Sequence, residues 1–282
     1  MSWKFELVAG PFSFTEGPAW DGEAVLFTHC PEHRIMRYHP ASGECSVFRT
    51  DTNEANGLMF DKDGRLYACE GDSKGDTHRM VRYNKDGTTT VIADNFKGKK
   101  LNSPNDLAFD KKGRLWFTDP RYGDKVDNLE LDHQSVFRAD PLPNDTWNLT
   151  RVTYDTTKPN GLLISPDQKV LYVAQSEYKL KMELRAYPIN ADGSLGEYSL
   201  LHNFSPHRGI DGMCLDTEGN IIATAGFDES GPGPMIYVFA PNGRILETHP
   251  VPRDNPTNCT FGDADLKTLY VTADGCLFRT RT

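Results

Sequence analysis

The feature that most constrains the fold is a sequence motif that recurs six times along the chain. Each copy opens with Glu, Asn or Asp, passes through a short stretch to Asp or Ser five residues later, and ends in an apolar run. Consecutive openings lie 40 to 55 residues apart, and they are Glu16, Asn56, Asn105, Asn160, Asp211 and Asn258. A polar turn between two apolar runs predicts a β-hairpin. Six hairpins at this spacing, each followed by a weaker strand pair, are typical of a propeller with four strands per blade.

The two ends of the chain predict how the ring closes. The sixth copy has room for only three strands, the last near residues 277–279. Residues 3–8 belong to no copy, and their alternation of apolar and polar residues predicts a strand. We expect this N-terminal segment to supply the outer strand of the last blade and to cover its open edge. An open solenoid or two β-sandwiches would explain neither the six copies nor the spare strand. The prediction is an all-β, six-bladed β-propeller that forms one domain over residues 1–282.

The composition argues against several classes of protein. The 31 basic and 40 acidic side chains give a net charge of −9 without a dense basic stripe, so we expect no nucleic-acid partner. No stretch approaches the apolar length of a membrane helix and the N-terminus lacks a signal-peptide core, which predicts a cytoplasmic protein without a membrane partner. Six scattered cysteines without CxxC spacing predict reduced thiols rather than disulfides or a zinc site. The oligomeric state is not predicted by these features.

The six opening residues predict a cation site. The innermost strands of a propeller line its axis, so the residues that open them should lie at one height around that axis. Carboxylates and carboxamides gathered there would offer only oxygen atoms, which suit Ca²⁺ better than structural zinc. Any single Asn or Asp is explained by turn formation alone. All six together, including a Glu that gains little from turn chemistry, favour convergence.

A polar rim should surround this site, because the second strand of each hairpin returns to the edge where the first began. Arg121 is a candidate cationic clamp, with Asp119 and Tyr122 beside it as candidate substrate-binding residues. His29 and His207 are further candidates for the rim. Surface polarity alone explains most of the rim segments one by one. They are residues 29–30, 70–72, 119–123, 175–177, 226–228 and 274–275.

Five motifs give the chain a family resemblance. They are Asn-Ser-Pro-Asn-Asp at 102–106, Leu-Trp-Phe-Thr-Asp-Pro-Arg-Tyr-Gly at 115–123, Glu-Gly-Pro at 16–18, Pro-Asn-Gly-Leu at 159–162 and Asp-Gly-Met at 211–213. Over essentially its whole length the sequence resembles the gluconolactonase branch of the SMP-30/gluconolactonase/luciferin-regenerating-enzyme family.

The resemblance implies a six-bladed propeller whose divalent metal is held by Glu16, Asn160 and Asp211. It also implies that Asn105 approaches metal and substrate, and that Asp211 serves as catalytic base. Asn56 and Asn258 have no such role in the family, so their place in the site is predicted from symmetry alone. The mammalian branch positions sugar with an Arg just before the Asn-Asp pair. Ser-Pro stands there in this chain, at 103–104, and Arg121 is the candidate substitute.

The resulting hypothesis is metal-assisted hydrolysis of a sugar lactone to the aldonic acid. The cation, Ca²⁺ in the first instance with Mg²⁺, Mn²⁺, Zn²⁺ or Fe²⁺ also compatible, would polarise the carbonyl. Asp211 would accept a proton from the attacking water, and Asn105 would orient the substrate or that water. Two alternatives stay open: hydrolysis of another ester or a phosphotriester at the same site, and a metal-stabilised scaffold that binds a partner without catalysis.

Overall fold

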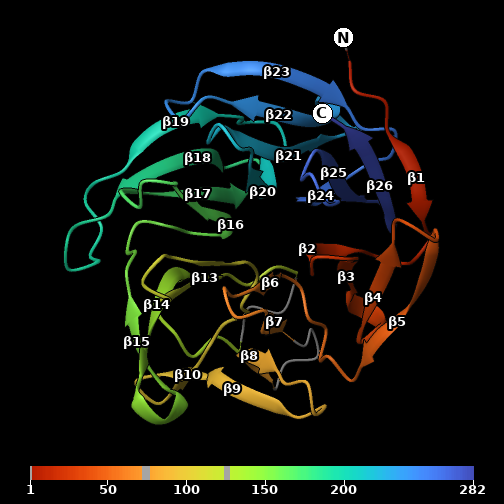
Figure 1. Cartoon of the computed structure of the whole chain (residues 1–282). Helices are drawn as coiled ribbons and strands as arrows, with labels where there is room; N and C mark the ends of the chain where they lie inside the picture. The colour runs from red at the N-terminus through yellow and green to blue at the C-terminus, as the bar shows by residue number, and fades with distance from the viewer. Residues whose placement is uncertain (1, 72–76, 124–127) are drawn as a thin grey trace.

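The computed structural model describes residues 2–71, 77–123 and 128–282. Six four-stranded antiparallel sheets stand around a central axis in the described chain, as blades of a propeller (Figure 1). The prediction of an all-β, six-bladed propeller is confirmed. Within the part of the chain that the structure describes, no helix has the length and apolar composition needed to cross a bilayer.

Blades 1 to 5 use consecutive strands, with the first strand innermost and the fourth outermost (Figure 1). Blade 1 contains β2 (Glu16–Trp20), β3 (Val25–His29), β4 (Arg34–His39) and β5 (Glu44–Thr50). Blade 2 contains β6 (Leu58–Phe60), β7 (Leu66–Gly71), β8 (His78–Tyr83) and β9 (Thr89–Ala93). Blade 3 contains β12 (Leu107–Phe109), β13 (Leu115–Asp119), β14 (Ser135–Leu142) and β15 (Thr146–Arg151). Blade 4 contains β16 (Pro159–Ile164), β17 (Val170–Glu177), β18 (Lys181–Pro188) and β19 (Ser199–Asn203). Blade 5 contains β20 (Ile210–Leu215), β21 (Ile221–Phe227), β22 (Ser230–Phe239) and β23 (Ile245–Pro250).

Blade 6 closes the ring with both ends of the chain. Its sheet has the order β1-β26-β25-β24, so the outer strand β1 comes from the N-terminus as predicted (Figure 1). In the pairing of β1 with β26, Glu6 faces Arg279 and their side chains form an ion pair of 2.8 Å. The bounds are β1 (Glu6–Ala9), β24 (Pro256–Gly262), β25 (Thr268–Ala273) and β26 (Cys276–Arg281). Smaller elements are the hairpin β10 (Asn95–Phe96) and β11 (Lys99–Lys100) and the 3₁₀ turns η1 (Cys30–Glu32) and η2 (Pro143–Asp145).

The residue five positions after each opening holds the hairpin turn together. In blade 2, Asp61 Oδ1 accepts hydrogen bonds from the backbone N–H groups of Asp63 and Arg65, at 3.0 and 2.9 Å. In blade 4, Ser165 Oγ does the same for Lys169 and Val170. A side-chain oxygen that satisfies turn N–H groups explains why the repeat keeps Asp or Ser here.

The glycine after an opening residue marks where one inner strand meets the next. A Cβ on Gly57 would lie 2.6 Å from the Asn105 carbonyl oxygen, and a Cβ on Gly161 would lie 2.5 Å from the Asp211 carbonyl oxygen. The Gly57 N–H also donates to the Asn105 carbonyl at 2.9 Å. Each inner strand contacts the inner strands of both neighbouring blades, so the ring is continuous. Glycine is required because a side chain would push these backbones apart.

The hydrophobic core is divided into six clusters, one between each pair of adjacent blades. Fully buried Trp116, for example, packs with Val173 of the next blade, and Leu26 of blade 1 packs with Leu66 of blade 2. In the described chain these clusters lie between the blades, and the inner strands line cavities on both sides of the ring, here called the channel. Polar side chains that open the inner strands are therefore free to face that channel.

Candidate functional site

Five of the six opening residues line one pocket at a mouth of the channel. The pocket has a volume of about 490 Å³, within the usual range for a small-molecule site. The opening residues on its wall are Glu16, Asn56, Asn105, Asn160 and Asp211. The predicted convergence is therefore seen for these five, which come from blades 1 to 5.

Strand position explains how the three predicted metal ligands reach this pocket. Glu16 is the first residue of β2, while Asn160 and Asp211 are each the second residue of their inner strands, β16 and β20. Glu16 is 3% exposed, and its Oε2 accepts a hydrogen bond of 2.5 Å from the N–H of Gly17. In all three blades the pairing with the second strand is irregular at this point, between Glu16 and Ala19 in blade 1 for example. A bulge of this kind re-aims the side chain at the end of a strand.

Asn105 lies in a loop that a buried carboxylate anchors. Asp119, which is fully buried, accepts hydrogen bonds from the backbone N–H groups of Asn102 at 2.9 Å and Ser103 at 2.8 Å. Asn102 in turn donates its amide to the Asp119 carbonyl. Burial raises the pKa of Asp119 to about 7, although these N–H groups oppose the shift. Asp119 therefore fixes the chain just before Asn105.

The surroundings of the two pocket carboxylates disfavour their charged forms. Burial raises the pKa of Glu16 well above its ordinary value, and the negative charge of Asp211 raises it further. Burial also raises the pKa of Asp211, against the opposing effects of Arg208 and of a hydrogen bond from Asn160. A cation placed between such carboxylates would stabilise both charged forms.

The donor set fits a hard cation. Glu16, Asp211 and the amides of Asn105 and Asn160 offer oxygen atoms of the type that Ca²⁺ prefers. In residues 2–71, 77–123 and 128–282, no three His, Cys, Asp or Glu side chains come together as a metal site. A cation in this pocket would therefore need amide oxygens to complete its shell. That requirement matches a pocket in which three of the five opening residues are asparagines.

Arg208 is a pocket residue that the sequence did not predict. Its Nη2 donates to Asp211 Oδ2 at 2.7 Å, and its Nη1 donates to the carbonyls of Gly226 at 2.8 Å and Pro256 at 3.2 Å. These bonds hold the guanidinium between blades 5 and 6 while one carboxylate oxygen of Asp211 is engaged. The sequence did contain a signal for this contact, because Arg208 lies only three residues before Asp211, the fifth opening residue.

Tyr122 is the one rim candidate of residues 119–123 that the structure places on the pocket wall. The side chain as a whole is 39% exposed, but its hydroxyl points into the pocket, where burial raises the pKa of this group above the ordinary value and the charge of Asp211 adds to this. The hydroxyl is therefore protonated at neutral pH, and it donates a long hydrogen bond of 3.4 Å to the Lys158 carbonyl oxygen. Ser176 and Phe227, from two other predicted rim segments, also line the pocket, as does Tyr178.

Other predicted rim residues lie elsewhere. Arg121 is not among the described residues that line the pocket. It is only 5% exposed, and its guanidinium lies near Asp119, with Nη2 3.3 Å from His78 Nδ1. The buried His29 contacts Ser13, and the exposed His207 contacts Ser230. Asp72, part of another predicted rim segment, lies outside the described residues.

Asn258 is the one opening residue that does not line this pocket, although its side chain forms a hydrogen bond with Glu16 and so lies next to the predicted site. Its side chain fills the space beside Gly212, and it lines a cavity at the other mouth of the channel. Asp106 lines the same cavity and was also missed. Burial raises the pKa of Asp106 to about 7, while hydrogen bonds that include one from Asn258 oppose this. The signal for Asp106 was in the repeat, since four other openings have Gly at this position.

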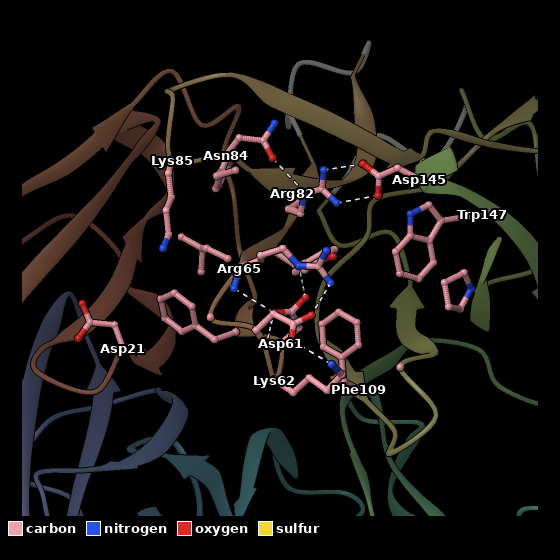
Figure 2. Close-up of a pocket in the computed structure, with 18 of the residues that line it drawn as sticks. Asp21, Asp61, Lys62, Arg65, Arg82, Asn84, Lys85, Phe109, Asp145 and Trp147 are labelled. Carbon is pink, nitrogen blue, oxygen red and sulfur yellow. Dashed lines mark hydrogen bonds and ion pairs between the residues drawn. The ribbon is translucent and has the colours of Figure 1, made fainter. Parts of the chain in front are cut away.

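A larger cavity of about 1670 Å³ lies at the opposite ends of the inner strands, beside the turns of blades 2 and 3 (Figure 2). Its charged side chains are largely satisfied by one another. Arg82 forms two hydrogen bonds with Asp145, and Arg65 pairs with Asp61 at 2.6 Å (Figure 2). None of the six opening residues lines it. This cavity therefore does not contain the predicted chemistry.

Comparison with known proteins shows the family of the chain. The SMP-30/Gluconolactonase/LRE-like region matches residues 14–275, nearly the whole chain. The chain belongs to this family. A gluconolactonase from Zymomonas mobilis is 31% identical, with a match that covers 100% of this chain and 82% of that protein. A 6-deoxy-6-sulfogluconolactonase from Pseudomonas putida is 28% identical over 67% of this chain and 65% of its own length.

Solved structures in the same family share the fold. A gluconolactonase from Xanthomonas campestris superposes with a TM-score of 0.82 at 30% identity, covering 99% of this chain and 89% of that chain. A luciferin-regenerating enzyme gives a TM-score of 0.79 at 19% identity, over 99% of this chain and 95% of that chain, and so shares the architecture. The family resemblance inferred from the five motifs is therefore confirmed.

Proposed function

We propose that this protein is a metal-dependent lactonase that opens a sugar lactone to the aldonic acid. The observation that carries the proposal is the convergence of Glu16, Asn105, Asn160 and Asp211 on one small-molecule-sized pocket. Membership of a family whose relatives include gluconolactonases supports the reaction class. Glu16, Asn160 and Asp211 would hold the cation, with Ca²⁺ favoured because every donor is oxygen.

When bound, a divalent cation supplies Lewis-acid polarisation of the lactone carbonyl. The chain's own residues then have separate tasks. Asp211 accepts the proton of the attacking water as general base. Arg208 holds that carboxylate in place through Oδ2, which leaves Oδ1 available to the cation and the water. The Asn105 carboxamide orients the lactone or the water.

Tyr122 is the proposed hydrogen-bond donor to the substrate. Its hydroxyl donates a long bond of 3.4 Å to the Lys158 carbonyl, and it would exchange this bond for one to the lactone carbonyl oxygen as negative charge develops there. The lactone ring would lie between this hydroxyl and the aromatic side chains of Tyr178 and Phe227, which pack edge to face at 5.6 Å. Apolar C–H faces of a sugar ring suit such a wall.

The test is aldonolactone hydrolysis followed by acid release with a pH indicator, using chelator-treated protein and added divalent metals. The Asp211→Asn variant should lose at least about 100-fold in kcat, the usual scale for removal of a general base. The matched control is Asp63→Asn, the same change at an exposed surface carboxylate, and it should retain activity. Wild-type protein that is inactive on every aldonolactone with every metal would contradict the proposal. Hydrolysis of esters or phosphotriesters alone would move the assignment to another electrophile.

A further inference from the structure

Two cysteine sulfurs meet where blades 5 and 6 pack together. Cys214 Sγ lies 3.4 Å from Cys259 Sγ, although the residues are 45 positions apart. Cys214 belongs to β20 and Cys259 to β24, the inner strands of adjacent blades, which contact each other directly. All six cysteines lie in the described part of the chain, and no other two of their sulfurs are in hydrogen-bond contact there.

The separation is suited to a covalent bond. A disulfide requires a sulfur–sulfur distance of about 2.05 Å, so the two atoms need to approach by about 1.4 Å. Rotation of two side chains about their Cα–Cβ bonds can supply an approach of this size with small backbone movement. The strands cannot close much further as a whole, because Gly212 already packs tightly against Asn258.

Small solutes can reach this pair through the channel. Both cysteines line the cavity of about 230 Å³ at the mouth opposite the Glu16 pocket. Cys214 is half-buried whereas Cys259 is 3% exposed, so Cys214 is the first sulfur that an entering molecule meets. Neither thiol has a role in the proposed hydrolysis.

We propose that Cys214 and Cys259 form an oxidation site, at which hydrogen peroxide converts the two thiols into a reversible disulfide between blades 5 and 6. In the first step the Cys214 sulfur attacks one peroxide oxygen, the O–O bond breaks, and one water leaves with the thiol proton. In the second step the Cys259 sulfur attacks the Cys214 sulfenic acid, and its hydroxyl leaves as the second water. Two thiols and one peroxide thus yield one disulfide and two waters.

The pair should react slowly, and its product should stabilise the fold. Burial raises the pKa of Cys214, and the neighbouring Cys259 raises it further, so little thiolate is present at neutral pH. We therefore expect oxidation by millimolar peroxide over minutes to hours. The bond would close a loop of the unfolded chain between positions 214 and 259, which favours the folded state. It would also tie β20 to the blade that β1 completes.

The experiment treats the native full-length protein with hydrogen peroxide, blocks free thiols with N-ethylmaleimide, and digests with trypsin without reduction. Cleavage after Arg208, Arg244, Arg253 and Lys267 places the two cysteines in separate peptides, 209–244 and 254–267, with one cysteine each. We expect these peptides to appear as one linked mass that dithiothreitol separates. Free thiols should fall from six to four, because one bond removes two, and the melting temperature should rise by several degrees.

Two variants and a control make the result specific. Cys214→Ser, at the half-buried position, should abolish the linked mass, and so should Cys259→Ser if that buried replacement folds. Cys45→Ser, another half-buried cysteine, should leave the linked mass unchanged. The proposal is overturned if native protein gives no linked mass, or if Cys214 is overoxidised while Cys259 stays free. It is also overturned if the link appears without a rise in melting temperature, because the bond would then have formed in unfolded chains.

Discussion

Replacing Gly57 with Ala tests whether packing of the inner strands sets the geometry of the pocket. The new Cβ would lie 2.6 Å from the Asn105 carbonyl oxygen and 3.0 Å from the Asp106 Cα, whereas ordinary contacts begin at 3.4 Å. The backbones of blades 2 and 3 must therefore separate by about 0.8 Å at this point, close to Asn105, the residue proposed to orient the substrate. Gly57 does not have a positive φ, so the substitution adds no strain of that kind.

Two magnitudes follow from this displacement. Overpacking of this type destabilises a protein by about 1–3 kcal/mol. With an unfolding entropy of about 2.1 cal/mol/K per residue, 282 residues change by about 0.6 kcal/mol/K, so the melting temperature should fall by about 2–5 °C. A shift approaching 1 Å in a catalytic group costs up to about 100-fold, so kcat/KM should fall by about 10- to 100-fold.

Thermal melting and lactone hydrolysis of the same preparation measure both effects. Gly196→Ala is the matched control, since its Cβ would meet Pro188 at an ordinary 3.5 Å and its φ is not in the positive range. The control should match the wild type in both assays. If Gly57→Ala behaves like Gly196→Ala, the inner strands are not in tight contact. If it loses stability but keeps full activity, the position of Asn105 does not govern the reaction.

Three further changes have defined outcomes. Asp119→Ala leaves the N–H groups of Asn102 and Ser103 without their acceptor, so the free energy of unfolding in urea should fall by about 1–3 kcal/mol. Activity should also fall, because the loop that contains Asn105 loosens. Wild-type activity would show that this anchor does not position Asn105. His249 is buried, stacks on Trp3 at 3.9 Å and lies 2.9 Å from Glu247, and burial lowers its pKa. The unfolded state therefore binds the proton more readily, and stability should fall as pH drops through the ordinary histidine range, as measured by urea unfolding at pH 7.5 and 5.5. The His249→Gln variant should lose this part of the pH dependence. An unchanged dependence in that variant would show that other groups cause it. Removal of a divalent cation present at 100 times its Kd should cost about 2.7 kcal/mol, or about 4–5 °C in the melting temperature, and identical melting with chelator and with Ca²⁺ would contradict binding to the folded state.

The fold was predictable because the same local requirements repeat along the chain. The turn Asp or Ser recurs in all six copies, and the close-packed Gly accompanies it in four, as Gly57 accompanies Asp61 in blade 2. The spare strand at the N-terminus followed from counting strands, and β1 pairs with β26 as expected. These features depend on local sequence, so a single sequence contains enough information to predict them.

The site was only partly predictable, because symmetry breaks where neighbouring blades differ. Asn258 obeys the repeat and reaches Glu16, yet it packs beside Gly212 and lines the cavity on the other side of the ring instead of the pocket. Arg121 was expected on the rim, but it turns inward to His78, and Arg208 lies beside Asp211 instead. Such choices depend on side-chain packing between segments far apart in sequence. The repeat pattern contains no information about that packing.

A crystal structure of the protein grown or soaked with Ca²⁺ tests the central claim most directly. The account predicts one cation in the channel pocket, with oxygen atoms of Glu16, Asn160 and Asp211 about 2.3–2.6 Å away and Asn105 beside it. A pocket without a cation at saturating Ca²⁺, or a cation bound by other residues, would contradict the claim that these blade openings form a metal site.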